Sequence, residues 1–357
     1  MRNSKRMLFV AGAALAAIGI SAAQAMADAP TTPRTVDIVG TGSDTTQFEL
    51  DQQSTDYNAA HPLPAPQLYS WDAVGSSPII EKDGCTSRPR PNGSGAGITE
   101  LEANLKSTTD SSAFCVDYAR SSRGPQATDP TSIVFLPFAI DAVTWSANSG
   151  GNAVANLSTD QLNAIYSCDA SLLGTGHTGP VTWNEVGGTS TAAIVPVIPQ
   201  SNSGTRAFFL QSIGNTALGT CVKGQDNTVE ENEGDNAIFS GADAANIVFP
   251  YSVAVYLAQT EHNHGAGDQG TMVLKSADGA SPTTVDGGTT VINSDFDLVR
   301  LVYNVVRNAG TAAAPAVPSY LQGVFGDGTG AVAGAICNDQ SAITDFGFLP
   351  FANCGVI

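Results

Sequence analysis

Basic side chains are scarce in this chain: 15 Lys and Arg residues stand against 33 Asp and Glu residues. The first 27 residues hold three basic side chains and no acidic ones, so their removal would leave 12 basic against 33 acidic residues. So acidic a chain disfavours nucleic acid or an anionic membrane surface as a partner, because both are recognised through Lys and Arg. A small anion remains possible, because local dipoles act at short range while salt screens distant charges.

Motifs of nucleophilic catalysis are also missing. The sequence holds neither a G-x-S-x-G elbow nor a P-loop, and none of its four His residues stands in a recognisable triad. His262 and His264, with Glu261 and Asp268, are a weak metal candidate, and a solvated loop is the favoured interpretation. We therefore expect a protein that is not an enzyme and that needs no cofactor or metal.

A cluster of acids, Glu230, Glu231, Glu233 and Asp235, is the other candidate cation site. It lacks the alternating spacing and central Gly of an EF-hand loop. We therefore interpret it as a solvated surface.

The first 27 residues have the pattern of a secretory signal peptide. Basic residues at 2, 5 and 6 precede an apolar stretch, Met7–Ala23, and Ala23-Gln24-Ala25 or Ala25-Met26-Ala27 offers a cleavage site. A membrane anchor is the alternative, although the apolar stretch is marginal for a span. No Cys follows the cleavage region, which disfavours a lipid anchor. We expect a secreted or periplasmic protein.

Six Cys residues, an even number in a chain with an export signal, predict structural disulfides. Pairing between sequence neighbours is the simplest scheme, although spacing alone leaves other pairings open. It gives Cys85–Cys115, Cys168–Cys221 and Cys337–Cys354.

Three short segments rich in Ser, Thr and Gly are the most informative feature: Gly42–Thr46, Gly93–Gly97 and Ser201–Thr205. Helical sequence follows each, and strand-like runs precede the first and third. A helix start offers unpaired N–H groups and a positive dipole end, and Gly lets a ligand approach the backbone. Each segment alone could be an ordinary N-cap. Together with the export signal, they favour binding of a small oxyanion. The candidate ligand residues are Ser43, Asp44, Thr45, Thr46, Ser94, Gly95, Ser203, Gly204, Thr205 and Arg206.

A fourth candidate is the turn at Arg120-Ser121-Ser122-Arg123. Because Arg is rare here, two of them beside a strand end predict a bidentate anion clamp. Salt bridges with the many surface carboxylates are the alternative.

The order of elements predicts an α/β protein with mostly parallel strand pairing, and roughly 330 mature residues suggest two lobes. Ile133–Trp145 is too long for one ordinary strand and could cross between lobes, and Asp297–Val306 could cross back. Ser158 and Gln161 have capping-box spacing before a helix. Residues 261–292 are polar and Gly-rich, which indicates a hairpin or a long loop.

This order of motifs resembles the phosphate-binding proteins of ABC uptake systems, in the type II periplasmic-binding-protein superfamily. The resemblance rests on residues 40–46, 93–98, 117–122, the strand 135–145, 157–166 and 201–209. More specifically, it resembles a branch of secreted substrate-binding proteins from high-G+C Gram-positive bacteria, which carry the same GSDTT, ARSSRGP and SGTR signatures.

The resemblance implies two α/β lobes joined by two crossing strands, with ligand bound between them. Residues 34–140 plus 300–357 would form lobe I, and 141–299 lobe II. Thr45 and Thr46 would match the first-loop donors, Ser94 the second-loop hydroxyl, and 203–205 the donors of lobe II.

Two departures from the family pattern concern the ligand. The family's Asp after the third strand, which accepts the proton of hydrogen phosphate, is replaced by Arg120-Ser121-Ser122, and Asp44 or Asp72 would be substitutes. The family's Arg before Ser-Gly-Thr is replaced by Pro199 or Gln200, with Arg206 following instead. We expect a monomer that binds phosphate or a similar oxyanion for an ABC importer permease. A surface interaction protein without ligand and a phosphatase-like enzyme are the alternatives.

Overall fold

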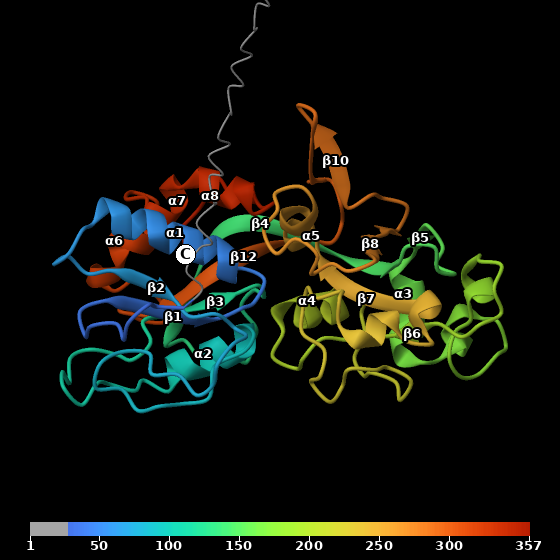
Figure 1. Ribbon diagram of the computed structural model, residues 1–357, viewed down its shortest axis with the longest axis horizontal. Helices are drawn as coiled ribbons and strands as arrows, with labels where there is room; N and C mark the ends of the chain where they lie inside the picture. Colours follow the sequence, from blue (N-terminus) through green and yellow to red (C-terminus); the bar gives the residue numbers. More distant parts are fainter. Residues whose placement is uncertain (1–27) are drawn as a thin grey trace, which may run out of the picture.

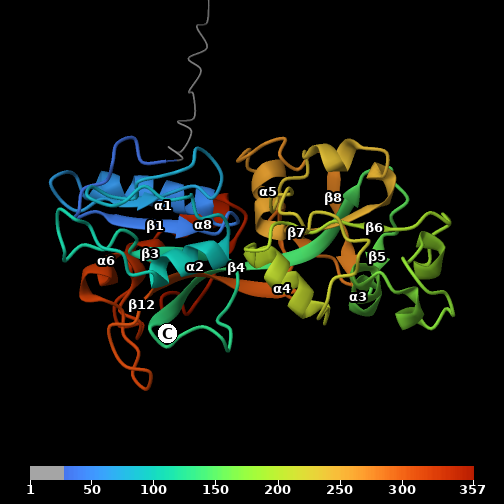
Figure 2. The same ribbon diagram turned by 90° about the horizontal axis from the view of Figure 1, so that it is seen from below.

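The computed structural model describes residues 28–357, so the predicted signal peptide lies outside the described residues. Two lobes lie side by side, and one long strand, β4 (Ile133–Asn148), runs from the first into the second (Figures 1 and 2). The prediction of a two-lobed α/β fold is thereby confirmed. Among the described residues, no helix is long and apolar enough to cross a membrane.

Lobe I is built on β1 (Ile38–Gly42), which pairs in parallel with β2 (Leu68–Ser70) and β3 (Tyr118–Ser121). The first glycine-containing segment follows β1 and leads into α1 (Gln47–Ala60). The second leads into α2 (Ser94–Glu102), which begins within the segment itself. The remaining elements come from the end of the chain: α6 (Gln322–Phe325), α7 (Ala335–Asn338), α8 (Gln340–Asp345) and β13 (Leu349–Pro350).

The centre of the main sheet is antiparallel, which corrects the prediction of mostly parallel pairing. Its order is β2-β1-β3-β12-β4-β7-β6, where β7 (Ile247–Ser252) and β6 (Val195–Pro196) belong to lobe II. Here β12 (Val299–Arg307) runs antiparallel to both β3 and β4. The reason is that the chain returns to lobe I along the strand by which it left. Pro137 is accommodated inside β4, opposite Tyr303, beside a register shift in β12.

Lobe II surrounds the second half of β4, which pairs with β7 (Ile247–Ser252) and β8 (Met272–Leu274). A short β6 (Val195–Pro196) extends the sheet beside β7, and β5 (Asn156–Leu157) pairs with β9 (Ser276–Ala277). The predicted hairpin is β10 (Thr283–Asp286) with β11 (Thr289–Ile292), and it projects from the top of Figure 1.

The helices of lobe II are α3 (Thr159–Ser167), α4 (Gly204–Ser212) and α5 (Val253–Thr260). The capping box predicted at α3 is present: Ser158 and Gln161 each bond the other's backbone N–H. Single 3-10 turns lie at Ala170–Leu173, Trp183–Val186, Ala237–Ser240, Ala244–Asn246 and Ser319–Leu321.

Apolar side chains on both faces of the sheet form the core. Trp145, from the second half of β4, is fully buried in it, and its indole N–H donates to the carbonyl of Ser276. In lobe II, Tyr166 of α3 meets Phe209 of α4 edge to face at 5.2 Å. This contact fixes the position of α4, whose first turn carries the third predicted segment.

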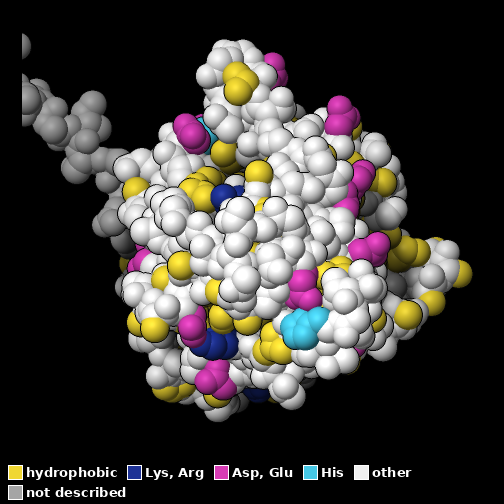
Figure 3. Space-filling model, turned by 90° about the vertical axis from the view of Figure 1, so that its right-hand side faces the viewer, with side chains coloured by type: hydrophobic (Ala, Val, Ile, Leu, Met, Phe, Trp, Pro, Cys, Tyr) yellow, Lys and Arg dark blue, Asp and Glu magenta, His cyan; other side chains and the backbone are white. Residues whose placement is uncertain are grey.

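The three disulfides join sequence neighbours, as predicted: Cys85–Cys115, Cys168–Cys221 and Cys337–Cys354. The first lies in lobe I before β3, the second ties the end of α3 to the loop after α4, and the third closes the C-terminal helices. The end face of lobe II in Figure 3 shows scattered charged side chains, among which acids are the more frequent. This face carries little that would attract a polyanion.

Candidate functional site

The three Ser/Thr/Gly segments meet where the lobes face each other. Ser203 caps α4 by accepting from the N–H of Arg206 at 2.9 Å. Just before it, the carbonyl of Asn202 accepts from the N–H of Gly95 in lobe I at 3.1 Å. The starts of α1, α2 and α4 therefore converge on one buried region.

Hydroxyl groups of lobe I form one wall of this region. Ser43 donates to the Oγ of Ser122 at 3.0 Å, and the backbone N–H of Ser122 donates to the Oγ of Ser94 at 2.9 Å. All three side chains are fully buried. Gly204 of lobe II lies against this wall, because a Cβ on it would be 2.3 Å from the Oγ atoms of both Ser94 and Ser122. Only glycine fits between these two hydroxyls.

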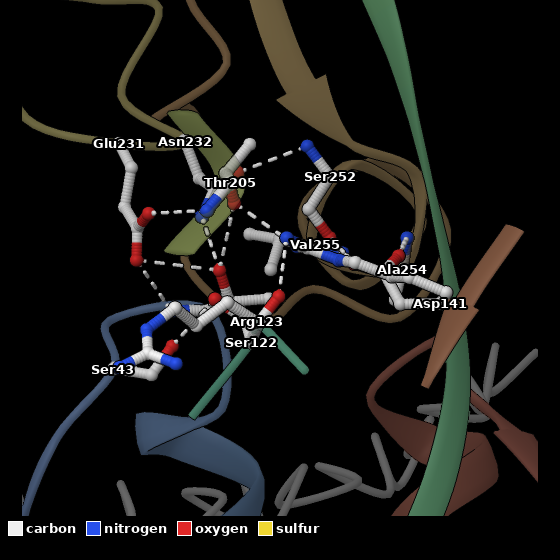
Figure 4. A network of polar contacts seen from close by, with 12 residues as sticks. Ser43, Ser122, Arg123, Asp141, Thr205, Glu231, Asn232, Ser252, Ala254 and Val255 are labelled. Atoms are coloured by element: carbon white, nitrogen blue, oxygen red, sulfur yellow. Dashed lines mark hydrogen bonds and ion pairs between the residues drawn. The ribbon is translucent and has the colours of Figure 1, made fainter. Parts of the chain in front are cut away.

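The carboxylate of Glu231 lies at one side of the polar network in Figure 4, between the starts of α1 and α4. Its Oε1 accepts from the backbone N–H and the hydroxyl of Thr45, both at 3.3 Å, and its Oε2 from the N–H of Thr205 at 3.3 Å. The Ser203 hydroxyl also donates to Oε2. The hydroxyls of Thr45 and Thr205 are 3.1 Å apart. Donors of both lobes thus surround a single anionic group that is fully buried.

This position of Glu231 corrects the interpretation of the acid cluster as a solvated surface. Asp235 is exposed and Glu230 and Glu233 are partly buried, but Glu231 has no solvent contact. A run of acids has no periodicity that would reveal the one that turns inward. Val229, an apolar residue two positions before Glu231, is also buried and is a local sign that this segment turns inward.

A buried ion pair completes the region. Arg300 of β12 donates to Oδ2 of Asp141 on β4 through Nε at 2.9 Å and a terminal nitrogen at 2.7 Å. The same guanidinium donates to the carbonyl of Ser122 at 2.8 Å and to the hydroxyl of Thr205 at 3.0 Å. One cation therefore touches both lobes. Sequence reasoning missed both residues, although a charge within an apolar strand run was a usable signal.

Asn232 holds the loop that carries Glu231. Its amide nitrogen donates to Asp44 and to the Thr45 hydroxyl, both at 3.2 Å, and its amide oxygen accepts from the N–H of Ser252 at 3.0 Å. Its backbone φ of 61° lies in the left-handed region, which Asn tolerates well. Burial, followed by the charge of Glu231, raises the pKa of Asp44 well above its usual range.

The two Arg residues of the predicted clamp point elsewhere. Arg120 is fully buried inside lobe I, where it donates to the carbonyls of Ser43 and Trp71 and to the hydroxyl of Ser70. Arg123 pairs with Asp129 at 2.8 Å, as in the salt-bridge alternative. The structure does not bring either guanidinium to the donors around Glu231.

The other candidate residues lie at the edge of the region. Arg206 donates to the carbonyl of Pro199 at 2.8 Å, within its own lobe. Ser121 donates to the carbonyl of Arg123, and Thr46 is the buried N-cap residue of α1. Asp72, the substitute acid considered above, has a pKa that burial raises.

Metal binding finds no support in residues 28–357, where no group of three or more His, Cys, Asp or Glu side chains is placed to hold an ion. His264 instead stacks on Phe346, with ring centres 3.9 Å apart. Its burial lowers the pKa of the imidazole, which favours the neutral form.

Comparison with known proteins identifies a family to which this chain is similar. The family model described as the PBP superfamily domain matches residues 28–333. An ABC-type phosphate transport receptor of Vibrio cholerae is similar in structure, with a TM-score of 0.52, 17% identity, and coverage of 88% of this chain and 99% of that one. A substrate-binding protein assigned to phosphate ABC transport in Clostridium perfringens, with bound phosphate, gives a TM-score of 0.54, 15% identity and coverage of 88% and 99%. No curated protein matches the sequence significantly. At these identities the likeness shows the shared fold.

Proposed function

The chain belongs to the PBP superfamily, and from this premise we propose that it is an exported solute-binding protein that captures phosphate or a similar small oxyanion between its lobes. The predicted signal peptide and the three disulfides suit an oxidising compartment outside the cytoplasm. A binding role, rather than catalysis, suits a site built from backbone N–H groups, hydroxyls and one Arg.

One observation carries the proposal: donors of both lobes converge on a single anionic group. The N–H groups of Thr45 and Thr205 stand at the starts of α1 and α4, where helix dipoles favour negative charge. The Ser203 hydroxyl and Arg300 add a neutral and a charged donor nearby. An external oxyanion bound here would join the lobes by the same bonds. The ligand residues of the proposal are therefore Thr45, Ser203, Gly204, Thr205 and Arg300, with Ser43, Ser94 and Ser122 behind them.

Selectivity among oxyanions follows from the acids near this point. The turn at 120–122 holds no carboxylate to accept a ligand proton, and the raised pKa of Asp44 disfavours its charged, accepting form. Arg300 favours a fully charged anion through charge-assisted hydrogen bonds. We therefore expect weak discrimination between phosphate and sulfate. Delivery to an ABC importer permease is the proposed destination, supported by the transport receptors that share the fold.

Titration calorimetry on residues 28–357 tests the proposal with phosphate, sulfate and arsenate as separate ligands. We expect one saturable site per chain for phosphate and for sulfate, with competition between them. A protein that shows no saturable heat with any of the three, and no shift in melting temperature at millimolar anion, would be better described as a surface interaction protein. The occupation of the donors by Glu231 is the observation that favours this second candidate.

A further inference from the structure

The donors predicted to bind an external anion already hold one from the chain itself. Both carboxylate oxygens of Glu231 are used: Oε1 by the N–H and hydroxyl of Thr45, Oε2 by the N–H of Thr205 and the hydroxyl of Ser203. Thr45 belongs to lobe I, whereas Ser203 and Thr205 belong to lobe II. The carboxylate therefore stands where a bound oxyanion would bridge the lobes.

We propose that Glu231 is an internal anion that occupies the ligand site, competes with external oxyanions and helps to hold the two lobes together. This inference rests on the proposed function for the identity of the competitor. A buried carboxylate is stable only with hydrogen-bond partners, and here the partners are the groups that a small oxyanion needs. Two anions at one set of donors would also repel each other strongly, because the site is buried away from water.

A different role, acceptance of the proton of hydrogen phosphate, does not suit this geometry. An acceptor carboxylate must stand beside the donors and leave them free for the ligand. Glu231 instead receives bonds from Thr45 and Thr205 directly. A ligand can use those N–H groups only after the carboxylate has moved away.

The loop around Glu231 shows what such a movement would break. Residues 222–236 contain no helix or strand, and backbone bonds at Lys223, Val229 and Gly234 tie the segment to the rest of the chain. The Asn232 carbonyl accepts from the Tyr251 hydroxyl and from Gln259 at 2.9 Å, and its side chain bonds Asp44 and Thr45. Asn232 thus anchors the loop while the Glu231 side chain extends into the site. The apparent affinity for an external anion would then equal the intrinsic affinity multiplied by the fraction of molecules in which Glu231 has left the site.

The test compares Glu231→Ala and Glu231→Gln with the wild type in titrations with inorganic phosphate and, separately, sulfate. Glu233→Ala is the matched control, since it removes a carboxyl group from the same loop without touching the donors. We expect Glu231→Ala to bind phosphate at least tenfold more tightly than the wild type, with Glu231→Gln in between and the control unchanged. Equal affinity in wild type and Glu231→Ala would overturn the inference. Weaker binding in Glu231→Ala would overturn it too, and would make Glu231 a ligand-contacting group.

Small-angle scattering without added anion separates this inference from the proposed function. The internal anion predicts a larger radius of gyration for Glu231→Ala than for the wild type and Glu233→Ala, because a link between the lobes is lost. If no protein binds either anion but Glu231→Ala expands, the proposed function and the competition both fail, and only the link that Glu231 makes between the lobes stands. If no protein binds and Glu231→Ala stays as compact as the wild type, the internal anion fails as well.

Discussion

Arg300 and Asp141 face each other across two antiparallel strands, and neither side chain has appreciable contact with solvent. Loss of one partner leaves the other as an uncompensated buried charge, which typically destabilises a protein by about 3–5 kcal/mol. We therefore expect Arg300→Ala to lower the free energy of unfolding in urea by this amount. The exposed pair Lys223–Asp243 provides the control, since Lys223→Ala should change the free energy of unfolding by less than about 1 kcal/mol. Similar small effects for both substitutions would contradict this reading of the pair.

Gly204 sets how closely the lobes approach. A Cβ at this position would lie 2.3 Å from the hydroxyl oxygens of Ser94 and Ser122 in the opposite lobe. Gly204→Ala should therefore keep the lobes apart, which would raise the radius of gyration in solution and weaken binding of phosphate or sulfate. Gly323→Ala is the control, because no atom lies within 4 Å of its added Cβ. Closure of the Gly204→Ala protein to the dimensions of the wild type would show that this contact is not limiting.

The disulfides differ in the lengths of chain that they close. Cys168–Cys221 spans 53 residues in sequence and Cys337–Cys354 spans 17. Chain entropy gives about 4 kcal/mol for the longer loop and about 3 kcal/mol for the shorter. Replacement of both Cys residues by Ala should therefore destabilise the protein more at 168 and 221 than at 337 and 354, as measured by urea unfolding of each double variant. The reverse order would mean that local packing, rather than loop length, dominates.

Stability should fall as pH rises from about 5 to 8. Burial, with the charges of Glu230, Asp235 and Asp268, raises the pKa of Glu233 to about 7. Burial likewise raises the pKa of Glu81 to about 7. Because both pKa values are higher in the folded state, the folded protein binds more protons, and this stabilisation is lost as pH rises through about 7.

Melting temperatures across this range provide the measurement. Glu233→Gln should make the decline shallower, since an amide does not titrate. Asp226→Asn should leave it unchanged, because Asp226 is exposed and its pKa is lowered, so that it titrates below this range. Stability that increases from pH 5 to 8 would rule out this account of the buried acids.

Much of the fold could be predicted because local signals agreed with the final structure. Ser158 and Gln161 marked the start of α3, and the even number of Cys residues in a chain with a predicted export signal indicated the three disulfides. The length of the apolar run from Ile133 identified the strand that passes between lobes. The direction of pairing was not predictable in this way, since it depends on where the chain returns.

Only part of the site could be predicted from the sequence. Helix-start residues such as Thr45 and Ser203 could be identified from residue type and position. Glu231 and Arg300 could not, because their roles arise from contacts between residues far apart in the chain. For Arg120, the position at a strand end predicted a ligand-binding residue. Its guanidinium instead donates to carbonyl groups inside lobe I.

We infer that the starts of α1 and α4 form an oxyanion site between the lobes. A crystal structure of the Glu231→Ala protein grown in phosphate would show whether phosphate binds there. We expect phosphate oxygens at hydrogen-bond distance, about 2.7–3.2 Å, from the N–H groups of Thr45 and Thr205 and from the Ser203 hydroxyl. Phosphate bound elsewhere on the chain, with these three donors turned to water or to other protein groups, would contradict the account.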